Sequence, residues 1–451
     1  MRHALRWLTV AIILACAVSP AHAAAANEIA VAAGDSIQEA IDKAPEGATI
    51  TLAAGVFPQS VTITKRLTLQ GAGWEKTVVG AEKQASLTQK DKDEFFAALE
   101  ATSNKEERAR IAIAFATGQA KPTLVVKNAK DVVLRGIKLR GPPSGSADGG
   151  LTAESLLTFD NAAGTISGCA VVGPFMNGIT VLGGSDVKIE KSLVAAMWGT
   201  GVAVAQRAKL HMSESDIRNC YHRCVTLSSD DATIEKCRIS GSAWHGIRYD
   251  HCSPKILGNH IFANARSGIY ASGRSAASVR GNVFWKNEMD AMSCWFDNSD
   301  TVESNTIAGN LREGISVLGG SKTNLSRNVF VDNPVAVLCS KIASRGQTPQ
   351  DAPVGNPTIE KNYFFRNAKD HVITEAVSPA PPGNETTDPK VGGPSENFAL
   401  AADSPARKAN AGAADPIPFA SPFAIQPEEK SIIPDSETRN YSKWKKLAAA
   451  R

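Results

Sequence analysis

The centre of this chain repeats itself every 22 or 23 residues, and this period constrains the fold more than any other feature. One apolar position recurs at steps of 23, 23, 22, 22, 23, 23 and 22 residues, at Ile179, Val202, Val225, Ile247, Ile269, Met292, Ile315 and Val337. Two more apolar series, beginning at Ile189 and Val194, follow with the same period. Each repeat therefore contains three short β-type runs. These cannot bury an apolar face alone, so successive copies must stack on one shared core.

Asparagine columns support a stacked coil of three parallel sheets. Asparagines recur in two columns, Asn259, Asn282, Asn305 and Asn328 in one, and Asn219, Asn264, Asn287, Asn310 and Asn333 in the other. Amide side chains stacked at the strand spacing of roughly 4.8 Å can hydrogen-bond along the stack and satisfy the backbone groups of turns. We interpret these asparagines as structural. Helical solenoids need about 33 residues per repeat or more, and the regular consensus of leucine-rich repeats is absent.

The residues before the repeats carry a family resemblance. The stretch GDSIQEAIDKAPEGATITLAAGVFPQSVTITKRLTLQGAG (34–73) resembles the opening of the pectin lyase-like superfamily, and a short helix over residues 37–43 is expected to cap the coil. The resemblance covers about residues 28–370. It implies an all-β fold, a single-stranded right-handed parallel β-helix with three parallel sheets and 22–23 residues per rung. This superfamily hosts many activities, so the resemblance implies the fold and not one function.

The chain is expected to divide into a leader, a solenoid and a tail. Residues 1–23 have the charged start, short apolar run and Ala-His-Ala ending of a signal peptide, which predicts cleavage after Ala23 and a periplasmic or secreted protein. The β-helix is expected over 24–372. A highly charged segment with apolar residues at helical spacing predicts a helical insertion at 83–121. Residues 373–451 are expected to form an extended C-terminal tail.

Composition narrows the choice of partners. The net charge is +4, from 49 basic and 45 acidic residues, and no run of Lys or Arg exceeds two residues, which argues against a nucleic-acid binder. No segment is long and apolar enough to span a membrane. The seven cysteines after the leader are an odd number, which does not suggest a complete disulfide framework. We expect a monomer.

Polar residues gather on the middle rungs of the predicted coil. Side chains alternate in and out along a strand, and equivalent positions of neighbouring rungs lie roughly 4.8 Å apart, so aligning the repeats maps the outer face. The outward positions between residues 223 and 297 hold Arg223, Asp230, His245, Arg248, Asp250, His251, Tyr270, Arg274, Asp290 and Trp295. The rungs at both ends carry small or apolar residues there. The clustering predicts a functional groove, and an ordinary ion-paired surface is the alternative.

The residue types in this groove suit an acidic sugar chain. A guanidinium pairs bidentately with a carboxylate, so Arg248 is the candidate for binding a uronate carboxylate and stabilising the enolate formed from it. His245 is the candidate general base, because its unperturbed pKa lies near neutrality. Tyr270 is expected to supply a proton, and Asp250 to orient a histidine. The candidates for substrate binding are Arg223, Asp230, His251, Arg274, Asp290 and Trp295.

Each candidate has a structural alternative. His245 is a possible turn cap, Asp250 a possible ion-pair partner of Arg274, and Trp244, at the position of Met289 two repeats on, a possible packing residue of the turn. No metal ligands are assigned and no cofactor is certain.

Motifs of known families match only in part. His245-Gly246 and Asp230-Asp231 resemble motifs of polygalacturonases, but the Asn-Thr-Asp motif of that family is absent. The segment 249–251, Tyr-Asp-His, resembles part of the Asp-Pro-His-Asp motif of alginate C5-epimerases. Calcium, which pectate lyases hold with clustered Asp residues, is left open by Asp230, Asp231 and Asp250.

Two classes of function follow from these observations. The first is an exported carbohydrate-active enzyme, a polysaccharide lyase or C5-epimerase acting on an acidic (uronate) polysaccharide. The second is a non-catalytic β-helix protein that binds carbohydrate or assists assembly in the periplasm, the class of the β-helix protein of nitrous-oxide reductase maturation. Hydrolase or esterase activity is a third possibility.

Overall fold

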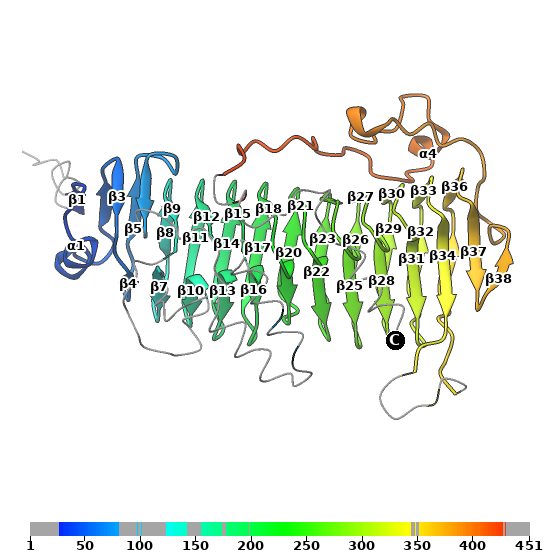
Figure 1. Ribbon diagram of the computed structural model, residues 1–451, viewed down its shortest axis with the longest axis horizontal. Coiled ribbons are helices and arrows are strands. Elements are labelled where there is room, and N and C mark those ends of the chain that lie inside the picture. Colours follow the sequence, from blue (N-terminus) through cyan, green and yellow to red (C-terminus); the bar gives the residue numbers. More distant parts are fainter. Residues whose placement is uncertain are drawn as a thin grey trace, which may run out of the picture.

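The computed structural model describes residues 27–80, 97, 101, 123–141, 155–173, 177–197, 199–343, 348, 351–426 and 429. Within these residues the chain winds into a solenoid whose rungs stack along one long axis (Figure 1). The predicted leader (1–23) and nearly all of the predicted helical insertion (83–121) lie outside the described residues. None of the described helices is long and apolar enough to cross a membrane.

Three parallel sheets form the walls of the solenoid, and each rung gives one strand to each sheet. Sheet A comprises, in spatial order, β1 (Glu28–Val31), β2 (Thr49–Leu52), β5 (Thr68–Gly71), β8 (Val132–Arg135), β11 (Ala163–Ser167), β14 (Asp186–Glu190), β17 (Lys209–Ser213), β20 (Ala232–Glu235), β23 (Lys255–Leu257), β26 (Ser278–Arg280), β29 (Thr301–Glu303), β32 (Asn324–Ser326) and β35 (Thr358–Glu360).

Sheet B follows sheet A in each rung. It comprises β3 (Gly55–Phe57), β6 (Thr77–Val79), β9 (Lys138–Leu139), β12 (Ala170–Val172), β15 (Leu193–Ala195), β18 (Asp216–Arg218), β21 (Arg238–Ser240), β24 (His260–Phe262), β27 (Val283–Trp285), β30 (Thr306–Ala308), β33 (Val329–Val331) and β36 (Tyr363–Phe365).

Sheet C completes the rung and carries most of the predicted site. It comprises β4 (Val61–Ile63), β7 (Leu124–Lys127), β10 (Ser155–Asp160), β13 (Asn177–Leu182), β16 (Thr200–Val204), β19 (Arg223–Leu227), β22 (His245–Asp250), β25 (Ile269–Ser272), β28 (Met292–Trp295), β31 (Glu313–Leu318), β34 (Val335–Ser340), β37 (Lys369–Ile373) and β38 (Ala376–Ser378). The strand pairs of sheet C are parallel except the last, in which β38 runs antiparallel to β37 and ends the ladder.

The core is a continuous apolar column inside the three sheets. The alternation predicted for sheet C is confirmed, because Ile247 and Tyr249 are fully buried while Arg248 between them is partly exposed. Each large apolar side chain buried in this way contributes about 1.5–3 kcal/mol. Tyr249 is a polar exception in the core, and its hydroxyl donates a hydrogen bond to the carboxylate of buried Asp300.

The predicted cap helix is α1 (Ile37–Lys43), which closes the N-terminal end of the column. Ser36 begins it, because the Ser36 hydroxyl accepts a hydrogen bond from the backbone N–H of Glu39. Ile37 and Ile41, four residues apart and therefore on one helix face, are buried over the first rung.

Asparagine ladders lie at two of the turns. A residue with left-handed backbone, such as Ser304 (φ 54°), makes the bend between sheets A and B, and a ladder asparagine follows it. Asn305 Nδ2 donates to Asn328 Oδ1 at 3.0 Å and to the carbonyl of Val279 at 2.9 Å. Asn305 Oδ1 in turn accepts from the backbone and side-chain nitrogens of Asn282. The structural interpretation is confirmed for this ladder and for the one through Asn264, Asn287, Asn310 and Asn333.

Asn219 was assigned to the second ladder, and that assignment is wrong. Asn219 takes the left-handed position itself (φ 56°), one residue before the ladder column, and its Nδ2 donates to Glu429 Oε1 at 2.6 Å. The unequal repeat lengths caused the slip by one residue.

The C-terminal segment turns back along the solenoid. After η4 (Pro394–Glu396) and α4 (Pro405–Lys408), it runs in extended form past the ends of β30, β27, β21 and β18 (Figure 1). Phe419 packs on the ring of His260 at 4.1 Å, and Glu429 makes a buried ion pair with Arg218 at 2.7 Å. Among the described residues, the segment therefore covers part of the outer face of sheet B.

Candidate functional site

The outer face of sheet C brings the main predicted residues into register. Arg223 in β19 lies beside His245 in β22, and Arg248 lies beside Tyr270 in β25, which in turn lies beside Ser293 in β28. We call the series Thr200, Arg223, His245, Ser267, Asp290 and Glu313, one residue from each successive rung, the outer column.

The local backbone turns His245 outward. A Cβ placed on Gly246 would meet Asn264 Nδ2 of the inner ladder at 2.8 Å, so position 246 faces inward and admits only glycine without a shift. His245 before it faces the outside of the solenoid, where its ring lies 4.8 Å from the ring of Tyr270.

Aromatic rings and guanidinium groups interleave around His245. The guanidinium of Arg266 lies 4.2 Å from the ring centre of Trp244, and that of Arg223 lies 5.3 Å from it on the neighbouring rung. The guanidinium of Arg248 lies 5.8 Å from the Tyr270 ring. Cation–π contacts of this kind contribute about 0.5–2 kcal/mol. The basic–aromatic cluster comprises His222, Arg223, Trp244, His245, Arg248, Arg266, Tyr270 and Trp295.

Positive charge is crowded in this cluster. Burial, and then the charge of Arg248, lower the pKa of Arg223 to about 9. Burial and the neighbouring arginines lower the pKa of His222 to about 3, and for the same reasons the pKa of His245 lies well below its usual value. Both imidazoles are therefore neutral near pH 7.

Asp250 is the carboxylate at the rim of the cluster. It lies 3.5 Å from Arg248 Nη2 and 2.8 Å from His251 Nδ1. Among the described residues, Asp250 pairs with Arg248 and His251, and no ion pair with Arg274 is present. Arg223 and Arg248 repel each other, and Asp250 is the carboxylate with a described contact to Arg248, so the charge of these two arginines would favour an anionic ligand at this face.

Buried polar atoms without a protein partner concentrate on the same face. Among the described residues, such atoms on these rungs of sheet C are Arg223 Nε, Thr226 Oγ1, His245 Nδ1, Asp290 Oδ1 and Glu313 Oε2. Native structures leave few buried polar groups unpaired, so a group of them in one place calls for an explanation.

Acidic residues occupy the other end of the outer column. Asp290 and Glu313 lie on adjacent rungs, and Glu313 Oε1 is 3.3 Å from Arg312 Nη2. Burial, and then the neighbouring Glu313, raise the pKa of Asp290 well above its usual value. Trp295, on the same rung as Asp290, donates from Nε1 to Ser293 Oγ at 2.6 Å, and its ring centre lies 5.5 Å from that of Tyr270.

Asp230, His251 and Arg274 lie at the turns that follow the sheet C strands. Asp230 Oδ1 accepts from the backbone N–H of Ser253 at 2.9 Å, which is a turn contact. His251 is exposed and has left-handed backbone (φ 53°). The structure thus brings together Arg223, His245, Arg248, Asp250, Tyr270, Asp290 and Trp295, with exposed His251 joined to this set through Asp250, and places Asp230 and Arg274 in turns.

The calcium set does not assemble either. Asp231 pairs with Lys209 at 3.6 Å, and Asp230 and Asp250 have the separate partners described above. The described part of the chain contains no group of three or more His, Cys, Asp or Glu side chains that could hold a metal ion.

His222, Arg266 and Glu313 belong to the site and were not predicted. His222, Trp244 and Arg266 occupy the turn position directly before the outer column on three successive rungs, so a second column was readable from the same alignment. Glu313 was on the aligned column but beyond the middle rungs on which the prediction concentrated.

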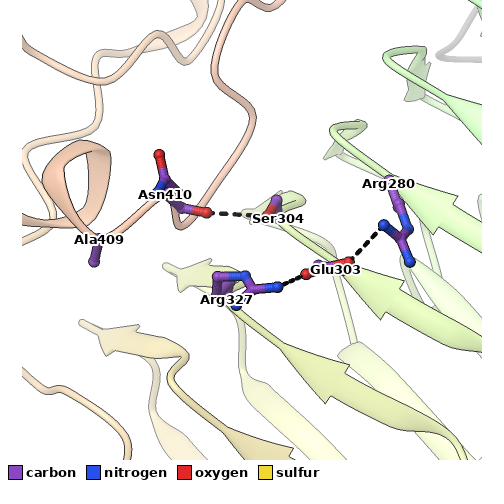
Figure 2. Close-up of a pocket in the computed structure, with 6 residues that line it drawn as sticks. All are labelled: Arg280, Glu303, Ser304, Arg327, Ala409 and Asn410. Carbon is purple, nitrogen blue, oxygen red and sulfur yellow. Dashed lines mark hydrogen bonds and ion pairs between the residues drawn. The ribbon is translucent and has the colours of Figure 1, made fainter.

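A separate cavity of about 490 Å³ lies between sheet A and the C-terminal segment. Figure 2 shows Glu303 between Arg280 and Arg327, with Ser304 reaching Asn410. The Ser304 hydroxyl donates to the Asn410 carbonyl at 3.0 Å. The Glu303 carboxylate is therefore already paired with two arginines, and the Ser304–Asn410 hydrogen bond holds the C-terminal segment against sheet A.

Comparison with known proteins addresses the fold. A family model described as a right-handed β-helix region matches residues 126–284. The chain is a right-handed parallel β-helix protein. The fold implied by the resemblance to the pectin lyase-like superfamily is thereby confirmed. No curated protein matches the sequence.

Three solved structures illustrate what the chain is similar to in fold. The PL6 family alginate lyase AlyGC is 12% identical, with a TM-score of 0.52, over 89% of this chain and 59% of that one. The catalytic domain of a GH87 α-1,3-glucanase is 12% identical, with a TM-score of 0.51, over 80% and 68%. The periplasmic alginate epimerase AlgG is 14% identical, with a TM-score of 0.49, over 76% and 82%. At these identities the likeness shows the fold alone.

Proposed function

We propose that the outer face of sheet C binds an acidic polysaccharide and acts on it as a uronate lyase or C5-epimerase. The observation that carries the proposal is the interleaving of guanidinium groups with aromatic rings around His245. Sugar carboxylates would neutralise the guanidinium groups, and sugar rings would stack on Tyr270 and Trp295, which are partly exposed.

The arrangement suits removal of a proton next to a carboxylate. Arg248 would bind the uronate carboxylate and stabilise the enolate as the C5–H bond breaks. His245 is neutral near pH 7 and so has a lone pair with which to take the proton. Burial raises the pKa of Tyr270, which keeps its hydroxyl protonated and able to donate.

Ligand binding would raise the pKa of His245. Its low pKa arises from burial and from the charges of Arg223 and Arg266, and a low pKa makes a weak base. A carboxylate placed against those arginines offsets their charge and moves the pKa of His245 back toward neutrality. The base would then gain strength when the substrate is bound.

A non-catalytic carbohydrate-binding role is the second candidate. The observation in its favour is the burial of His245, which is 6% exposed beneath Trp244 and Tyr270. A base must reach the C5 proton, whereas the exposed edges of the cluster are sufficient for binding.

The cellular setting is part of the proposal and rests on the sequence. Cleavage after Ala23 would release residues 24–451 to the periplasm or the exterior as a monomer, with the β-helix over 24–372 and the tail over 373–451. Mass spectrometry of the protein exported by its host cell would test the cleavage site.

A polymer screen tests the function. The purified protein is incubated with alginate, polymannuronate and pectate while the absorbance of unsaturated uronates is followed, and the polymers are then analysed by NMR for inverted C5 centres. Lyase or epimerase activity is supported if Arg248→Ala and His245→Gln no longer form unsaturated uronates or inverted C5 centres. The control Lys188→Ala, on sheet A, should still form them. Binding without product supports the second candidate. If the protein binds none of these polymers, both candidate functions are wrong.

A further inference from the structure

Asp290 and Glu313 form a buried pair of carboxyl groups at the acidic end of the outer column. Asp290 is 4% exposed and Glu313 is 8% exposed. They lie on adjacent rungs, roughly 4.8 Å apart along the solenoid, with the Glu313 carboxyl within hydrogen-bonding reach of Asp290. Asp290 Oδ1 and Glu313 Oε2 nevertheless have no partner among the described residues.

Two ionised carboxylates cannot satisfy each other. Each is an acceptor only, and two like charges held this close and out of water repel. The charged group next to the pair is Arg312, which contacts Glu313 and offsets one negative charge. Ser293 on β28 adds a hydroxyl, and Cys294 carries a thiol whose pKa burial raises, so it is neutral. A single proton between Asp290 and Glu313 removes the second charge and supplies the missing hydrogen bond.

The pair stands opposite His245. His245 and Asp290 belong to one column with Ser267 between them, so their backbones lie two rungs, about 10 Å, apart. Ser267 is the smallest of these residues and, like them, it is buried (2% exposed), so a sugar ring reaches it only when Tyr270, whose ring lies 4.8 Å from that of His245, moves aside. A pyranose ring seated over Ser267 would have the imidazole on one side and the carboxyl pair on the other, beside Tyr270.

Building on the proposed function, we infer that Asp290 and Glu313 hold one proton between them and exchange it with C5 of the uronate on the face opposite His245. His245 takes the C5 proton, and the electron pair of that bond passes into the carboxylate held by Arg248. The Asp290–Glu313 pair then gives its proton to C5 from the other side and is left doubly ionised. Solvent returns the proton from His245 to the pair, so no atom is gained or lost. The reaction is therefore C5 inversion.

Infrared spectroscopy tests the shared proton without any substrate. A protonated carboxyl has a C=O stretch that ionised carboxylates lack. Slightly above neutral pH, Asp300 is ionised, because its pKa lies at about 6. The native protein is expected to show the band there, and Asp290→Asn is expected to lose it, since Glu313 is then left with Arg312. Asp332→Asn, at an exposed ion pair with Arg366, is the matched control and should keep it. A native protein without the band overturns the sharing.

Hydrogen exchange in D₂O tests the two-sided chemistry. Polymannuronate and polyguluronate, which differ in configuration at C5, are incubated separately with each variant and examined by NMR. His245→Gln and Asp290→Asn are both expected to lose inversion at least 100-fold. Each should still exchange the C5 hydrogen of one homopolymer, and a different one for each variant. Circular dichroism melting shows that the variants are folded.

The outcomes separate this inference from the proposed function. If Asp290→Asn inverts C5 within tenfold of the native rate, the inference is wrong while the proposed function stands. The same holds if the native protein forms only unsaturated ends. If no uronate polymer is turned over, the proposed function fails and the catalytic role of the pair fails with it, but the infrared band still decides whether the proton is shared.

Discussion

The asparagine ladder at the bend between sheets A and B and the outer column at the start of sheet C pass through several of the same rungs and differ in nearly every physical respect. The ladder places the same residue on each rung from Asn259 to Asn362, and every amide is hydrogen-bonded to the next. The outer column changes residue at each rung, from Arg223 and His245 to Asp290 and Glu313, and leaves buried atoms unpaired. Repetition stabilises a solenoid, so a column that abandons it is the place to look for function.

The first prediction concerns the ladder. Asn305→Ala removes the partners of the Asn282 backbone N–H and of the Val279 carbonyl, and both remain buried. Because each unpaired buried group costs about 1–3 kcal/mol, we expect the free energy of unfolding to fall by roughly 3–5 kcal/mol. Chemical denaturation measures it.

Serine provides the matched control for that change. Ser192 and Ser215 occupy the same column in earlier rungs, where Ser215 Oγ accepts from the backbone N–H of Ser192 at 3.1 Å. Asn305→Ser should therefore lose less stability than Asn305→Ala. A loss below about 1 kcal/mol in both variants would show that the ladder is dispensable.

The second prediction concerns the outer face. Arg248→Ala is expected to weaken binding of a uronate polymer about 10- to 100-fold, because a charge-assisted hydrogen bond contributes about 1.5–3 kcal/mol. Isothermal titration calorimetry at fixed salt measures it. Arg248→Lys should recover only part of the affinity, since it keeps the charge and loses the bidentate fork. Equal affinity in all three proteins would mean that the polymer binds elsewhere.

The sequence predicts the structure well where the 22–23-residue repeat continues, and poorly where no repeat is present. The 22–23-residue period identified the three sheets, and the alternation around Ile247 and Tyr249 placed Arg248 on the outside, as the structure confirms. The repeat alignment was wrong at Asn219, because unequal repeat lengths shift the alignment there by one residue. The docking of Phe419 on His260 was not predictable, because a segment without periodicity carries no register.

The candidate site was predictable only where strands determine register. Arg223, His245, Arg248 and Tyr270 lie on strands or at their first residue, and the structure brings them together. Turn geometry decided the remainder, and Arg274 and Asp230 diverged from the cluster because side-chain directions in turns do not follow a period of two.

The third prediction uses pH. The pKa of His222 is about 3 in the folded protein and ordinarily about 6.5 in an unfolded chain. Between these values the unfolded chain binds a proton that the folded protein does not, so stability falls as the pH falls through this window, by up to about 1.4 kcal/mol per pH unit. His222→Gln removes this contribution and should flatten the acid limb of a stability–pH curve. His251→Gln, at an exposed position, is the control, and identical curves for His222→Gln and the native protein would contradict the prediction.

The smallest expected effect is a change in the free energy of unfolding, and its sign should differ between the outer column and the asparagine ladder. Arg223→Thr gives this rung the residue that the preceding rung has at Thr200. It removes a buried guanidinium whose Nε is unpaired and which lies beside Arg248 and Arg266. We expect the free energy of unfolding to rise by about 1 kcal/mol, against some loss of packing on Trp244, while polymer binding weakens. Denaturation and calorimetry on one preparation measure both. A less stable variant with unchanged binding would make Arg223 a structural residue, whereas a gain in stability with a loss of affinity means that the outer column maintains its charge at the expense of the fold, which no residue of the ladder does.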